Sequence, residues 1–185
     1  MSALHNAAGR GDVDTMERLL SVPRATKKLR LSARDGANTP LHTAVLEGQL
    51  EAVKMLIAHG ADVNEEESNC GFQPLHRASM LGHADIAAFL VSCGGEMRHS
   101  KKSRSTPLHH AATVAVAKVF LDAEPSLVND QCSASRTPLI HAIERKNIDL
   151  VALLLDRGAS PDVSDYFEWT PLHFAAAERD PCFLD

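Results

Sequence analysis

A four-residue pattern recurs along the chain at an almost constant interval, and it restricts the possible folds more than any other feature. The form Thr-Pro-Leu-His stands unchanged at 39–42, 106–109 and 170–173, and forms that differ at one residue stand at 73–76 and 137–140. The prolines of these five copies are separated by 34, 33, 31 and 33 residues. A fixed period of this length indicates a repeat architecture, in which each unit packs only on its neighbours.

The unit at residues 38–64 carries the local signals of two helices joined by a turn. Pro40 stands where the first helical turn does not need its N–H, and Thr39 precedes it as a capping residue. Gly48 interrupts the first helix, and Gly60 suits the left-handed residue that ends the second. Apolar residues at helical spacing give the second helix a buried stripe: Val53, Leu56 and Ile57.

With its period near 33 and its T-P-L-H-x-A motif, the chain resembles the ankyrin-repeat family from end to end. The resemblance implies an all-α repeat solenoid of stacked helix-turn-helix units with β-hairpin-like fingers, forming one domain over residues 1–185. We expect five complete repeats and one partial C-terminal repeat, at about 2–34, 38–64, 71–98, 105–129, 136–163 and 169–185. Because the sixth unit ends before a second helix of normal length, we also expect the chain to be a piece of a longer protein. The alternative is that its tail packs atypically.

Two units depart from the pattern. In the first unit, Pro23 ends the second helix, because proline cannot continue one. The connection that follows is about four residues longer than usual. We expect a solvated loop there, although such insertions often lie on the binding face. The fourth unit, 105–129, has no glycine turn and lacks about three residues between its helices. We therefore expect the weakest or most distorted joint of the stack in that unit.

Charge and composition argue against several kinds of partner. The net charge is −5, so we expect no nucleic-acid partner, although the basic run 98–104 could act as a nuclear-import signal. No apolar run approaches the roughly 18 residues of a membrane helix, so we expect no membrane insertion. There is no signal-peptide pattern. The cysteines lie far apart, which suits reduced thiols in a cytoplasmic or nuclear protein: Cys70, Cys93, Cys132 and Cys182.

The ten histidines invite a search for metal ligands, but their spacing argues against a metal site. Five occupy the fourth position of the motif: His5, His42, His76, His109 and His173. In the ankyrin-repeat family this histidine hydrogen-bonds the backbone of adjoining fingers, and the resemblance implies the same role here. The sequence has no H-E-x-x-H, G-x-S-x-G or P-loop motif. We expect no metal, no cofactor and no enzyme activity.

The resemblance also implies a concave binding surface made of finger tips and first-helix faces. Mapped from each motif proline, this surface includes Leu46, Glu47, Cys70, Phe72, Met80, Leu81, Val114, Arg136, Glu144, Arg145, Tyr166, Phe167 and Trp169. Large apolar residues at such positions are typical of interaction hot spots. We expect the apolar residues to anchor a partner and Arg136, Glu144 and Arg145 to orient it. Alternatively, Tyr166 and Trp169 pack against fingers or against a further repeat.

The leading functional hypothesis is a protein–protein interaction module: an adaptor, inhibitor or substrate-recruiting scaffold, monomeric when alone, that binds a protein partner on its concave face. The alternative is a regulatory or targeting ankyrin segment of a larger enzyme, ubiquitin-ligase receptor or channel. A third hypothesis is binding of an anionic surface or nucleic acid through the basic segments 24–34 and 98–104. The acidic remainder of the chain argues against it.

One modification motif is visible in the second unit. Leu56 and, after five intervening residues, Asp62-Val63-Asn64 resemble the ankyrin sequence hydroxylated by the asparaginyl hydroxylase of oxygen sensing. That resemblance makes Asn64 a possible acceptor. The same Asp-Val-Asn sequence also suits a turn without any modification.

Overall fold

The computed structural model describes residues 2–97 and 100–177. It divides into two compact units, residues 1–96 and 97–185. The first unit contains α1 (Ala3–Arg10), α2 (Val13–Leu20), α3 (Arg24–Leu31), α4 (Pro40–Leu46), α5 (Leu50–Ala58), α6 (Pro74–Leu81) and α7 (Ala84–Ser92). The second contains the 3-10 helix η1 (Pro107–His110), α8 (Val114–Ala123), the 3-10 helix η2 (Pro125–Asn129), α9 (Pro138–Glu144), α10 (Ile148–Asp156) and α11 (Pro171–Ala177).

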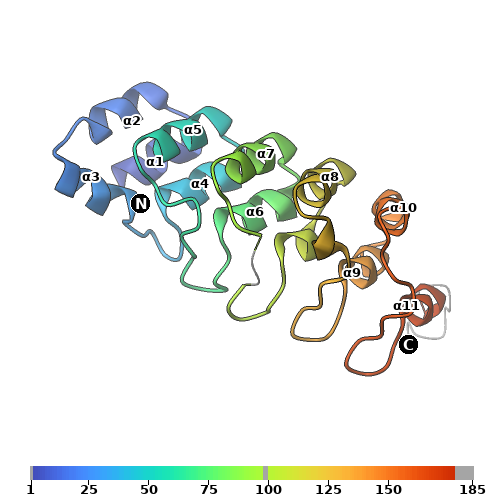
Figure 1. Ribbon diagram of the computed structural model, residues 1–185. Coiled ribbons are helices and arrows are strands. Elements are labelled where there is room, and N and C mark those ends of the chain that lie inside the picture. Colours follow the sequence, from blue (N-terminus) through green and yellow to red (C-terminus); the bar gives the residue numbers. More distant parts are fainter. Residues whose placement is uncertain (1, 98–99, 178–185) are drawn as a thin grey trace. The chain divides into compact units, whose positions relative to one another are not determined.

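The helices of each unit form two layers, as the repeat pattern predicts (Figure 1). In the first unit α1, α4 and α6 contact one another in sequence order, and α2, α5 and α7 do the same. In the second unit η1, α9 and α11 form one series of contacts and α8 contacts α10. Over the described residues no strand is present beyond one isolated bridge between Asp35 and Asn38. The predicted all-α repeat fold is confirmed, whereas the exact repeat bounds and the single domain stay predictions.

Three motif histidines, His5, His42 and His109, each tie the start of their helix to the next finger. At α4 the Thr39 hydroxyl accepts a hydrogen bond from the His42 backbone N–H and lies 2.9 Å from Nδ1 of the same histidine. The Nε2 of His42 lies 3.1 Å from the carbonyl oxygen of Phe72. Since a carbonyl oxygen can only accept, Nε2 carries the proton, and Nδ1 accepts from the threonine hydroxyl.

The same bond recurs inside each unit. His5 Nε2 lies 3.1 Å from the Asn38 carbonyl oxygen, and His109 Nε2 lies 3.1 Å from that of Arg136. The predicted structural role is therefore confirmed for these two histidines and for His42. In the fifth repeat the position holds Ile140, which is fully buried and cannot make the bond.

The fingers are hairpin-like although they are too short to form strands. In each, the N–H of the first residue donates to the carbonyl of the last over 2.8 to 3.0 Å: Asp35 to Asn38, Glu67 to Phe72, Ser100 to Ser105, Cys132 to Arg136, and Asp165 to Trp169. Neighbouring fingers within a unit are joined by one further backbone bond: Ser68 to Ala37, Ser133 to Ser103, and Tyr166 to Ala134. These bonds satisfy backbone groups that would otherwise depend on water.

The core lies between the two layers of each unit. Of the predicted stripe of α5, Val53 and Leu56 are buried and Ile57 is half-buried. Leu150 and Leu154 of α10 are buried in the same way. Burial of each such side chain contributes roughly 1.5–3 kcal/mol. Small residues such as Ala44 in the first helices are also fully buried, which lets neighbouring helices approach closely.

Asparagine side chains lock the finger starts of two repeats. Asn64 donates through Nδ2 to the Gly94 carbonyl at 3.0 Å, and its Oδ1 accepts from the Glu96 N–H at 2.9 Å. Asn129 makes the equivalent pair with the Gly158 carbonyl, at 3.1 Å, and the Ser160 N–H, at 2.8 Å. These bonds satisfy backbone groups just beyond the C-terminal end of the next repeat's second helix. The structural reason for asparagine at position 64 is therefore independent of any modification.

The two irregular units differ in how well they were predicted. The long connection of the first unit was expected to be a solvated loop, and this was wrong. Residues 24–31 form α3, because Pro23 precedes a run of good helix formers and Leu31 is buried. Arg30 also donates to the Leu19 carbonyl at the end of α2. In the fourth unit the first helix is reduced to the four-residue η1, so the expected distortion is confirmed.

Burial lowers the pKa of His42 to about 4, from an ordinary value of 6.5. The folded state therefore resists protonation at a pH where the unfolded chain accepts it. The stability that this histidine contributes is complete above about pH 6.5 and is lost as the pH falls towards 4.

We predict that protonation of His42 removes roughly 3 kcal/mol from the free energy of unfolding between pH 7 and pH 4. Urea denaturation at a series of pH values measures this loss. The matched variant is His42→Ile, since isoleucine occupies this position in the fifth repeat. The variant should be less stable at pH 7 but lose less stability on acidification. Equal pH dependence in both proteins would contradict the assignment.

Candidate functional site

The residues predicted to bind a partner in the first unit are not equally accessible. Met80 and Leu81, at the end of α6, are exposed by 39% and 46%. Glu47 and Cys70 are exposed and Leu46 is half-buried. Phe72 is only 8% exposed, so its prediction as an accessible anchor was wrong. Met80 and Leu81 are thus the apolar side chains that this surface offers.

Phe72 is buried because it packs against an internal ion pair, Glu67 with Arg77. Its ring stacks on His76 with centroids 5.1 Å apart, and the Arg77 guanidinium lies 5.3 Å from the ring centroid. Arg77 also donates to Glu67 through Nε at 3.0 Å and through Nη2 at 2.8 Å. The Glu67 carboxylate is buried, and a buried carboxylate needs such a partner. Sequence reasoning missed this cluster because Glu67 and Arg77 are ten residues apart.

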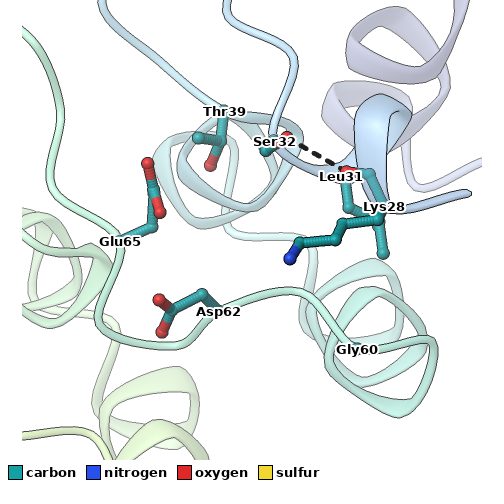
Figure 2. A pocket seen from close by; sticks show the side chains of 7 residues that line it. All are labelled: Lys28, Leu31, Ser32, Thr39, Gly60, Asp62 and Glu65. Atoms are coloured by element: carbon teal, nitrogen blue, oxygen red, sulfur yellow. Dashed lines mark hydrogen bonds between the residues drawn. The ribbon is translucent and has the colours of Figure 1, made fainter. Parts of the chain in front are cut away.

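The basic segment of the first unit lies against acidic residues (Figure 2). A pocket of about 140 Å³ separates α3 from the second finger. Lys28 extends over this pocket toward the side where Asp62 and Glu65 lie. Arg34 pairs with Glu65 at 2.5 Å. Because these carboxylates offset the cations, the arrangement does not favour an anionic partner. Part of the second basic segment, residues 98 and 99, lies outside the described residues.

In the second unit, five side chains line an open pocket of about 330 Å³: Arg136, Asp165, Phe167, Trp169 and Phe174. We call it the aromatic pocket. Arg136 comes from the finger before α9, and the next three come from the finger before α11. Phe174 lies on α11 itself. The repeat structure brings them together, because the finger and first helix of one repeat lie beside those of the next.

Ionic bonds hold one wall of the aromatic pocket. The Nη1 of Arg136 lies 2.7 Å from Glu144 Oε1, and its Nε lies 3.4 Å from Asp165 Oδ2. The guanidinium carbon is 5.1 Å from the centroid of the Phe174 ring. Asp165 Oδ1 accepts the backbone N–H groups of Phe167 at 2.9 Å and Trp169 at 3.1 Å. One buried carboxylate therefore shapes the finger and positions the arginine.

The other walls are aromatic and accessible. Phe167 is 71% exposed and Trp169 is 39% exposed, and Tyr166 beside them is 77% exposed. Trp169 meets Phe174 edge to face with centroids 5.4 Å apart. Exposed aromatic groups of this kind mark binding surfaces more often than chance. Tyr166 and Phe167 contact each other but are largely open to solvent, whereas Trp169 is partly covered by His173 and Phe174.

His141 lies beside this pocket and is uncharged at neutral pH. Burial lowers its pKa to about 4, and the positive charges of Arg145 and Arg136 act in the same direction. Its Nδ1 lies 3.4 Å from Glu144 Oε2, but this contact is not an ion pair above that pH. At neutral pH Glu144 therefore pairs with Arg136 rather than with His141.

The structure brings together the predicted residues Arg136, Glu144, Phe167 and Trp169. Arg145 is exposed and Val114 is half-buried, and neither lines the pocket. Sequence reasoning missed Asp165 and Phe174. Phe174 stands three residues after its motif proline, at a position that was not counted as outward-facing. An aromatic residue there, where other repeats have Thr43 or Arg77, was the available signal.

Within residues 2–97 and 100–177 there is no group of three or more His, Cys, Asp or Glu that could hold a metal ion. In the same part of the chain, no helix has the length and apolar character needed to cross a membrane. Cys182 and the end of the sixth unit lie outside the described residues.

Two family models match the chain. The model described as "Ankyrin repeats (3 copies)" matches residues 1–67 and 108–183, and the model described as "Ankyrin repeat" matches 70–101. Human inversin is 30% identical over 195 residues, covering 100% of this chain and 18% of inversin. Human protein phosphatase 1 regulatory subunit 27 is 37% identical over 87 residues, covering 46% of this chain and 53% of that protein.

The chain spans about half or less of the length of these two relatives, and 28% and 16% of two others. Among solved structures, the ankyrin repeat domain of human ASB11 superposes with a TM-score of 0.82 at 26% identity. That superposition covers 97% of this chain and 79% of the other.

We predict that Arg77→Met costs about 3–5 kcal/mol in the free energy of unfolding, because it leaves the Glu67 carboxylate buried and unpaired. Urea denaturation measures the loss. Adding Glu67→Gln should recover much of it, since the double variant buries no charge. The control is Lys54→Met, which breaks the exposed 2.7 Å pair with Glu51 and should cost less than about 1 kcal/mol. Equal losses for Arg77→Met and Lys54→Met would refute the role given to the buried pair.

Proposed function

Because the chain belongs to the ankyrin-repeat family, we propose that it is a protein–protein interaction module whose main anchor site is the aromatic pocket. A folded partner or a peptide would place a side chain between the finger and α11. The name of one relative, a regulatory subunit of protein phosphatase 1, supports a binding role for the repeats. In this proposal the module acts as an adaptor, inhibitor or recruiting scaffold.

The observation that carries the proposal is the exposure of large aromatic side chains beside a fixed ion pair. Phe167 and Trp169 are 71% and 39% exposed, and Arg136 is held by Glu144 at 2.7 Å. Rigid rings bury large areas at little entropic cost, and a preorganised polar group adds orientation. The repeat core does not need these rings at the surface, whereas a binding site does.

Met80 and Leu81 form a second, smaller surface in the first unit. Both are exposed, and Glu47 of the preceding repeat is exposed as well. We include this surface in the proposal as a secondary contact. We also propose a cytoplasmic or nuclear location, a monomeric state when alone and no nucleic-acid partner. The net charge of −5 and the acidic residues around Lys28 support the proposal that nucleic acid is not a partner.

The proposal is tested by affinity capture from cell lysate with the double variant Phe167→Ala, Trp169→Ala. The control is Ile148→Ala, Leu155→Ala, since these α10 residues are 79% and 46% exposed and lie outside the pocket. Circular dichroism melting should show that all three proteins fold. We expect a protein captured by the wild type and the control to be lost from the pocket variant. Truncation of such anchors costs about 2 kcal/mol or more of binding free energy.

If the pocket variant and the wild type retain the same proteins, the anchor site is misplaced. The next variant would then be Met80→Ala, Leu81→Ala in the first unit. Loss of captured proteins from the control alone would point to the face of α10 instead and would also contradict the proposal.

Asn64 remains a proposed hydroxylation site. Its carboxamide is engaged at both ends by the next repeat, so an enzyme would have to open the finger locally to reach it. We predict that co-expression with the asparaginyl hydroxylase adds one oxygen to the peptide containing Asn64, measured by mass spectrometry. Asn129, held by the same two bonds but not preceded by Asp-Val, is the internal control. Absence of added oxygen on the Asn64 peptide would contradict the proposal that Asn64 is hydroxylated.

A further inference from the structure

We propose that the aromatic pocket receives a basic side chain, arginine or lysine, from the partner protein. The side chain's aliphatic stem would pack on the rings of Phe167 and Trp169, and its cation would approach the carboxylate of Asp165. This inference rests on the proposed function and states the chemistry of the residue that the pocket recognises.

Two rings of the pocket, Phe167 and Trp169, are available to a cation from outside. The chain itself places an arginine over an aromatic ring twice, Arg77 over Phe72 at 5.3 Å and Arg136 over Phe174 at 5.1 Å. In the part of the chain that the structure describes, no cation stands over Phe167 or Trp169. Tryptophan is the aromatic side chain that attracts cations best.

The charged groups at the aromatic pocket also favour a cation. Among the described residues, Arg136 is the one basic residue that lines the pocket, and it faces two carboxylates, Glu144 at 2.7 Å and Asp165 at 3.4 Å. Arg136 and Asp165, which line the pocket, cancel each other, so that Glu144 leaves a formal charge of −1 on these three groups, offset in part by the exposed Arg145. The negative faces of the aromatic rings add to this sign. An incoming carboxylate would therefore be repelled, and an incoming cation would complete the charge balance.

One carboxylate oxygen of Asp165, Oδ2, receives no short hydrogen bond from the described residues. Its Oδ1 accepts two backbone N–H groups, whereas the 3.4 Å contact of Oδ2 with Arg136 is long for a charged hydrogen bond. The residue is only 5% exposed, yet it lines the pocket. A volume of about 330 Å³ is enough for the stem and head of one long basic side chain. An apolar side chain would fill the space but leave Oδ2 without a strong donor.

The test uses Trp169, which is the only tryptophan of the chain, so that its fluorescence reports on this pocket alone. The full chain is titrated with capped pentapeptides that have alanine at four positions and arginine, lysine, norleucine or glutamate at the centre. We expect the arginine and lysine peptides to bind about fivefold or more tightly than the norleucine peptide. The glutamate peptide should bind weakest.

Two variants locate the charge. Asp165→Asn keeps an oxygen for the two backbone N–H groups but removes the negative charge, so it should reduce the preference for arginine over norleucine to about one. Glu168→Gln removes an exposed carboxylate on the same finger that does not line the pocket. This variant should keep the preference for arginine over norleucine within about twofold of the wild-type value, because an exposed charge is well screened. Melting temperatures confirm that both variants fold.

Equal binding of the arginine and norleucine peptides would overturn the inference and leave a purely apolar anchor site, with the proposed function intact. Tightest binding by the glutamate peptide would overturn it as well. If no peptide changes the Trp169 signal at millimolar concentration, a basic side chain is not what the pocket recognises. Failure of the proposed function itself is seen separately, in the lysate capture with Phe167→Ala, Trp169→Ala.

Discussion

The fold depends on a hydrogen bond from a buried, neutral histidine to the finger of the following repeat. This bond joins the start of one helix pair to the next at His5, His42 and His109. At His42 burial keeps the imidazole uncharged, so that one nitrogen donates to a carbonyl while the other accepts from threonine. At the candidate site this bond holds the backbone of Arg136, whereas the next finger, which follows Ile140, is shaped by the Asp165 carboxylate instead.

The fold could be predicted from the sequence because its determinants are local and recur. Thr39, Pro40 and His42 lie within four residues, and the apolar stripe of α5 follows at fixed spacing. Where the chain departs from the period, prediction was less secure. The shortened fourth unit was expected to be distorted and is, whereas α3 was missed, because the family pattern offers no helix at that point.

The candidate site could be predicted only in part, because it depends on contacts between residues distant in sequence. The repeat pattern placed Arg136 and Trp169 at equivalent positions of neighbouring fingers. It could not show that Asp165 links them, or that Phe174 lies under the guanidinium. In the first unit the same limitation made Phe72 look like an anchor, while Glu67 and Arg77 use it to cover an internal ion pair. An aromatic residue at an outward position of the repeat thus indicates a site only where the folded chain leaves it exposed, as at Phe167 and Trp169.

The most direct test of the account is site-specific photocrosslinking. The photoreactive residue p-benzoylphenylalanine would replace Phe167 in the pocket or Leu155 on α10, both of which are exposed. After irradiation in cell lysate, the account predicts a defined crosslinked protein from position 167 and none from position 155. Crosslinks of equal yield from both positions, or from position 155 alone, would contradict the claim that the aromatic pocket is where a partner binds.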